Sequence, residues 1–138
     1  MKLNKKHFLL GLAFLSLTWI IIDFLRQPGP ESLKGGFVEK AFVRNEQNTG
    51  PVLRIYVATV KDTLWTEMET YGNYKPHTKY GTTIVYFFLE GAPVPSKINI
   101  EGAHHINPEF QKYCVAEYKK SPMGQVILNK RPFNGFEF

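Results

Sequence analysis

The chain has 138 residues, the length of one ordinary domain or of a smaller domain with an appendage. Its hydrophobic content of 43% is ample for a core, which excludes a globally disordered chain. The formal net charge of +5 is concentrated near the N-terminus, because residues 1–36 carry +3 and residues 37–138 only +2. A nucleic-acid-binding domain is expected to carry a basic stripe on the domain itself. The sequence therefore predicts no nucleic-acid partner.

The N-terminal segment is predicted to contact the membrane. Residues 1–7 are positive, residues 8–22 carry no charge, and the apolar run resumes after Asp23 as far as Leu25. Its uncharged core of fifteen residues is at the long end for a signal peptide, whose apolar region has about 7–15 residues. Residues 8–25 are at the short end for a bilayer span, which needs roughly 17–25. We expect an anchor in residues 1–25, with a cleaved signal peptide as the alternative.

Three further features favour the anchor. No small-x-small cleavage pair follows the apolar run, and Trp19 lies near its outer end, where interfacial aromatic residues sit. Residues 26–36 are rich in Pro and Gly and are predicted to be a linker. Basic residues flank the apolar run more heavily on its N-terminal side: Lys2, Lys5 and Lys6 against Arg26 and Lys34. This bias predicts a single-pass protein of the bacterial inner membrane with its domain on the extracytoplasmic side; the alternative is a secreted or periplasmic protein.

The domain comprises residues 37–138, and its first half is predicted to contain two strands and a helix. Residues 37–44 and 52–60 are strands, because they are rich in β-branched and aromatic residues and are bounded by turn signals. Residues 63–71 are a short helix with apolar residues at i, i+4 and i+7. Asp62 or Thr63 is expected to cap this helix, and Gly72 to end it as the C′ residue.

The second half is predicted to add strands on both sides of a central one. Residues 82–89 are apolar on both faces, which is typical of the centre of a sheet, and residues 97–100 suit a short edge strand. Residues 107–131 favour a hairpin, after a helical turn at 108–111, over a helix followed by a strand. The predicted fold class is α+β, a small and mostly antiparallel sheet with one packed helix, preceded by an N-terminal transmembrane helix.

Catalytic and ligand motifs are absent from the sequence. It contains no G-x-S-x-G, H-E-x-x-H, Walker A or G-x-G-x-x-G pattern, and we expect no cofactor. The single cysteine, Cys114, is predicted to be a buried structural thiol; the alternative is a nucleophile beside His77, His104 or His105. Adjacent His104 and His105 lack a second ligand at a recognisable spacing, so no metal site is predicted. An enzyme is therefore the less favoured class.

The stretch from residue 71 to residue 80 is the best candidate for a binding loop. Its Tyr, Gly and Asn content suits adaptable contact surfaces, and its candidate binding residues are Tyr71, Tyr74, His77 and Tyr80. The alternative is a solvated connection whose tyrosines cover the edge of the core. The predicted function is a membrane-anchored interaction or accessory module with an envelope protein as its partner. The alternative is a secreted small-molecule-binding protein or small enzyme.

Overall fold

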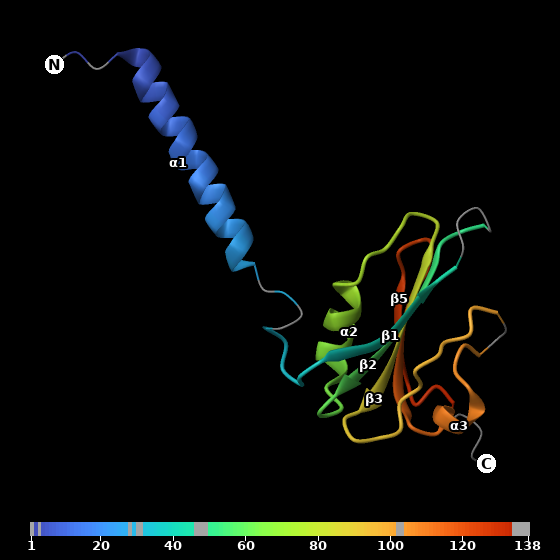
Figure 1. Ribbon diagram of the computed structural model, residues 1–138. Helices are drawn as coiled ribbons and strands as arrows, with labels where there is room; N and C mark the ends of the chain where they lie inside the picture. The colour runs from blue at the N-terminus through green and yellow to red at the C-terminus, as the bar shows by residue number, and fades with distance from the viewer. Residues whose placement is uncertain are drawn as a thin grey trace.

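A computed structural model describes residues 2, 4–27, 29, 32–45, 50–101 and 104–133 of the chain. The long N-terminal helix stands apart from a compact sheet domain (Figure 1). The elements follow one another as α1 (Lys5–Arg26), β1 (Val38–Arg44), β2 (Leu53–Val60), α2 (Trp65–Asn73), β3 (Thr82–Leu89), α3 (Pro108–Gln111), β4 (Cys114–Lys120) and β5 (Val126–Lys130).

The five strands form one sheet in chain order, β1-β2-β3-β4-β5. All neighbouring strands are antiparallel except β2 and β3, which pair in parallel. Parallel neighbours need a crossover connection, and α2 is that connection. The predicted class, a mostly antiparallel sheet with one helix packed on a face, is confirmed, and β3 lies at the centre as expected.

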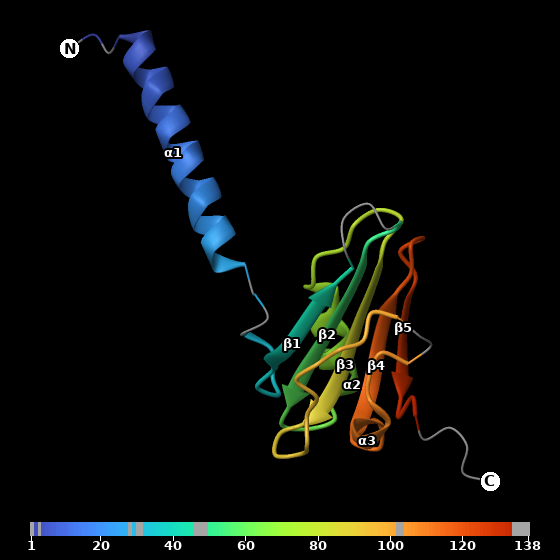
Figure 2. The same cartoon turned by 45° about the vertical axis from the view of Figure 1, so that its right-hand side comes forward.

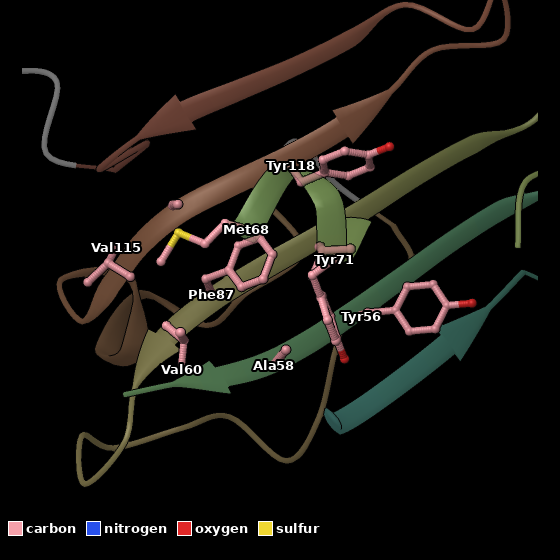
Figure 3. Packing of buried hydrophobic residues seen from close by; sticks show 10 residues of the cluster. Tyr56, Ala58, Val60, Met68, Tyr71, Phe87, Val115 and Tyr118 are labelled. Carbon is pink, nitrogen blue, oxygen red and sulfur yellow. The ribbon is translucent and has the colours of Figure 1, made fainter. Parts of the chain in front are cut away.

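One face of the sheet packs against α2. Met68 and Tyr71 point from the helix onto the strands, where they meet residues such as Phe87 and Tyr118 (Figure 3). Ten buried residues form this cluster: Tyr56, Ala58, Val60, Met68, Tyr71, Val85, Phe87, Val115, Ala116 and Tyr118. The recurrence of apolar residues in α2 therefore predicted the side of the helix that is buried.

The opposite face is covered by the long segment between β3 and β4. Figure 2 shows this segment crossing in front of the strands before it reaches α3. It contributes Val94, Ile98, Ile106 and Phe110 to a second core with Ile55, Val57, Ile84, Tyr86, Phe88 and Cys114. Because both faces of β2 and β3 are covered, these strands are continuous apolar runs without an alternating pattern.

The ends of α2 differ from the sequence-based expectation. Leu64 occupies the N-cap position and makes no side-chain cap, while the Oδ1 atom of Asp62 accepts the Thr63 N–H at 2.7 Å. The predicted cap at Asp62 or Thr63 is therefore wrong. Gly72 lies inside the helix and does not end it, because the helix continues to Asn73.

The segment at 107–131 is a short helix followed by a hairpin, as favoured. The Gly124 N–H donates to the Ser121 carbonyl at 2.9 Å, which closes the turn between β4 and β5. Residues 97–100 do not form the expected edge strand. Ile98 and Ile100 instead pack against the second core, because this stretch crosses the sheet face and the two sheet edges belong to β1 and β5.

Candidate functional site

Helix α1 is an apolar rod that the domain leaves uncovered. Its 22 residues extend about 33 Å at 1.5 Å per residue, and none of them is buried. The apolar run within the helix, residues 8–25, spans about 27 Å, slightly less than a bilayer core of about 30 Å. The hydroxyls of Ser16 and Thr18 donate to the carbonyls of Leu12 and Phe14 at 2.9 and 2.8 Å, so neither needs a water partner. Within the described chain, α1 is the one helix long and apolar enough to cross a membrane. A signal sequence has the same properties.

The four candidate binding residues of the tyrosine-rich stretch are not brought together. Tyr71 is only 3% exposed; its ring stacks on Phe37 at 4.6 Å between centroids. Tyr74 ends α2 and is partly exposed, whereas Tyr80 is 65% exposed with a φ of 67°. Tyr71 is thus a core residue, and Tyr80 alone of the three tyrosines presents most of its ring to solvent.

His77 faces inward toward the start of β3. Its Nδ1 atom lies 2.9 Å from the Thr83 hydroxyl, while Nε2 is buried without a hydrogen-bond partner in the described part of the chain. Desolvation lowers the pKa of this imidazole, and the positive charges of Lys120 and Arg54 add to the effect. The packing between the loop and the sheet therefore disfavours protonation of this ring.

Lys75 forms an aromatic clamp that the sequence did not reveal. Its Nζ atom lies 4.7 Å from the ring centroid of Tyr56 and 4.6 Å from that of Tyr71, and 2.9 Å from the Glu39 carboxylate. Burial by itself lowers the pKa of this ammonium, but its hydrogen bonds to Glu39 and Tyr71 outweigh burial and raise it. The side chain thus stays charged and links β1 to the end of α2. Its partner Glu39 lies 36 positions away in the chain.

Cys114 is a buried thiol, as predicted. It is 1% exposed, and its Sγ atom lies 3.3 Å from the Ala116 carbonyl. Burial raises the pKa of the thiol to about 12, so the thiolate that a nucleophile requires is strongly disfavoured. The geometry therefore opposes a Cys-dependent reaction at this position.

The two adjacent histidines have separate structural contacts. The His104 ring packs edge-on against Phe133, with 5.5 Å between centroids, and the Nδ1 atom of His105 lies 2.7 Å from the Asn99 carbonyl. Among the described residues, no three His, Cys, Asp or Glu side chains gather as metal ligands. Each histidine thus contributes to the fold of the segment that covers the second core.

A groove of about 390 Å³ opens where β1 begins and where β2 and β3 end. It is lined by Gly36, Val38, Lys40, Thr59, Lys61, Glu90, Gly91, Ala92, Val94, Pro95 and Ser96. Sequence reasoning missed this site, although Gly and Pro turn signals mark two of its walls.

No family model matches the chain, and no curated protein or solved structure matches it. The candidate sites are therefore defined by geometry. The groove combines cationic, anionic and apolar walls, so it suits a small polar ligand, whereas the exposed residues of the tyrosine-rich loop suit surface contacts.

Proposed function

We propose that the chain is a single-pass membrane protein whose α+β domain is an interaction module on the extracytoplasmic side, serving as an accessory to an envelope assembly. The observation that carries the proposal is that no residue of α1 is buried against the domain. Thirteen of its large apolar side chains are exposed. At about 1.5–3 kcal/mol for each buried side chain, a bilayer offers this helix on the order of tens of kcal/mol.

The basic residues that flank α1 support the orientation. Lys2, Lys5 and Lys6 precede or begin the helix, and Arg26 ends it. Cytoplasmic flanks carry the excess of Lys and Arg, so this arrangement favours the N-terminus in the cytoplasm of a bacterial cell and the domain outside it.

The surface of the domain supports an interaction role. Among the described residues, the outermost strands β1 and β5 each pair with one neighbouring strand, so the other edge of each has no strand beside it. Several large side chains are exposed around them, including Phe42 on β1, Ile127 on β5 and Met123 in the turn before β5. An envelope protein held in the same membrane meets these surfaces at high effective concentration, because the linker restricts the domain to the space near the bilayer.

Photo-crosslinking in living cells tests this proposal. A photoreactive residue at Ile127, Met123 or Tyr80 is expected to capture a discrete membrane-protein partner when α1 is intact. In the matched control, residues 1–25 are replaced by a cleavable signal peptide, and capture is expected to weaken strongly. Added protease should digest the domain in spheroplasts and leave it intact in whole cells. A protected domain in spheroplasts contradicts the orientation, and equal capture from the released domain contradicts the need for an anchor.

A further inference from the structure

The groove lies at the end of the domain that is connected to the membrane anchor. Gly36, one of its lining residues, comes ten positions after Arg26, the last residue of α1. Even fully extended, ten residues span at most about 33–36 Å. Val38, at the start of β1, pairs with Thr59 near the end of β2, so the mouth of the groove and the linker share one end of the sheet.

Backbone hydrogen bonds fix three walls of the groove relative to one another. The Lys61 N–H donates to the Gly35 carbonyl at 2.7 Å, and the Glu90 N–H donates to the Val60 carbonyl at 2.9 Å. The stem of Lys61 lies against Gly36, where an added Cβ would come within 3.0 Å of the lysine Cε. Glycine at this position therefore leaves room for the lysine stem along the wall.

A β-bulge brings a second cation to the groove. The pairing of β1 with β2 shifts between Glu39 and Ala41, which makes Lys40 the extra residue of the bulge. Bulges at sheet edges commonly redirect a side chain away from the regular alternation. Lys40 thereby becomes a lining residue together with Lys61.

The charged groups of the groove have no ionic partner within the described protein. The single ion pair there joins Lys75 to Glu39, outside the groove. Lys40, Lys61 and Glu90 are all exposed, and neither lysine is within ion-pair distance of the Glu90 carboxylate. Two ammonium groups and a separate carboxylate are thus available to a ligand that carries both an anion and a cation.

We infer that this groove binds the phosphoethanolamine headgroup of a membrane lipid, an inference that rests on the proposed membrane anchoring. The phosphate pairs with Lys40 and Lys61, and the primary ammonium pairs with the Glu90 carboxylate. Val38 and Val94 provide apolar walls for the glycerol end of the lipid. The position of the groove beside the linker favours a lipid over a free phosphate ester.

Lipid retention by the full-length chain tests the inference. The protein is inserted into nanodiscs with equal amounts of phosphatidylethanolamine, phosphatidylglycerol and phosphatidylcholine, and the lipids that stay bound are counted by native mass spectrometry. Phosphatidylethanolamine is expected to dominate. The double variant K40Q/K61Q should lower its retention about three- to tenfold, in the range of exposed charge pairs. The control K112Q/K119Q, which changes two lysines outside the groove, should retain it. E90Q should abolish the preference over phosphatidylglycerol.

Two further arms separate the possible failures. Free phosphoethanolamine is titrated into the full-length chain in detergent and followed by NMR; binding as tight as that of a short-chain phosphatidylethanolamine overturns the lipid assignment. Equal retention of the three lipids, or equal losses in the groove and control variants, overturns the site. These results leave anchoring intact if the chain resists alkaline extraction, whereas release by alkali refutes the anchor itself.

Discussion

Replacement of Gly72 by alanine probes how tightly α2 packs on the sheet. An added Cβ would lie 2.4 Å from the Cγ and Cδ2 atoms of Tyr118, far inside ordinary contact. The ring has little freedom to retreat, because Tyr118 is fully buried and its hydroxyl donates to the Asn73 Oδ1 at 2.7 Å. The substitution therefore forces α2 away from β4.

Two opposing effects set the expected size of the change. Alanine is favoured over glycine inside a helix by about 1 kcal/mol. Overpacking a rigid core costs about 1–3 kcal/mol, and a fully buried ring places this site at the upper end. We expect Gly72→Ala to lower the free energy of unfolding by about 2 kcal/mol, or the Tm by roughly 8–16 °C for a domain of this size.

Urea and thermal unfolding of the full chain in detergent, followed by near-ultraviolet circular dichroism, measures this loss. Thr66→Ala on the exposed face of α2 is the matched control, because it raises helix propensity without a new core contact. That control should be as stable as the parent or slightly more so. A Gly72→Ala chain that is as stable as the parent would refute the close approach and favour the original view of Gly72 as a helix terminator.

Four other measurements test the account. Leu15→Arg should reduce membrane insertion roughly 100-fold, since a central arginine costs about 2.5–3.5 kcal/mol, whereas Leu15→Phe should insert normally. Lys75→Met should lower the free energy of unfolding by about 1–2 kcal/mol, because it removes the aromatic clamp. If Lys75→Met destabilised the protein less than Glu39→Gln does, the aromatic clamp would be contradicted. The folded state depresses the His77 pKa below 6.5, so the unfolded chain takes up the proton first as the pH falls. The free energy of unfolding should therefore decrease as the pH drops below that value. His77→Gln should flatten this dependence of stability on pH, and an unchanged dependence would contradict the burial of the ring. At pH 8 the Cys114 thiol should react with a disulfide reagent only at the rate of unfolding, so an immediate reaction would show an accessible thiolate.

Local pattern was sufficient for the strands and the hairpin. Residues 82–89 are apolar on both faces because the helix and the covering segment bury both sides of β3, and that information is contained in the run itself. The turn between β4 and β5 was equally predictable, because Pro122 and Gly124 occupy the positions that a type I turn favours.

Contacts between distant residues explain what the sequence could not reveal. Gly72 resembles a helix terminator in sequence, but it is required by the ring of Tyr118, which lies 46 positions away. Tyr71 is part of a stretch with the composition of a binding loop, yet the packing of α2 places it in the core. These two roles depend on the tertiary packing of α2 and are not contained in its local sequence.

The candidate groove was missed for the same physical reason. Lys40, Lys61 and Glu90 come from three separate segments, and they meet only because β1 starts where β2 and β3 end. No spacing within the sequence marks such a set. The bulge at Lys40 adds a further shift that an alternating strand pattern does not predict.

The state of the N-terminal segment in the cell decides whether residues 1–25 anchor the protein in the membrane. Membranes from cells that express the native chain are washed at alkaline pH, and the intact mass of the protein is measured in pellet and supernatant. A membrane-anchored protein gives the full-length chain in the pellet, because α1 is long and apolar enough to cross a membrane and its own domain leaves it exposed. A soluble chain shortened by roughly 20–30 residues, the usual length of a signal peptide, would contradict the anchor.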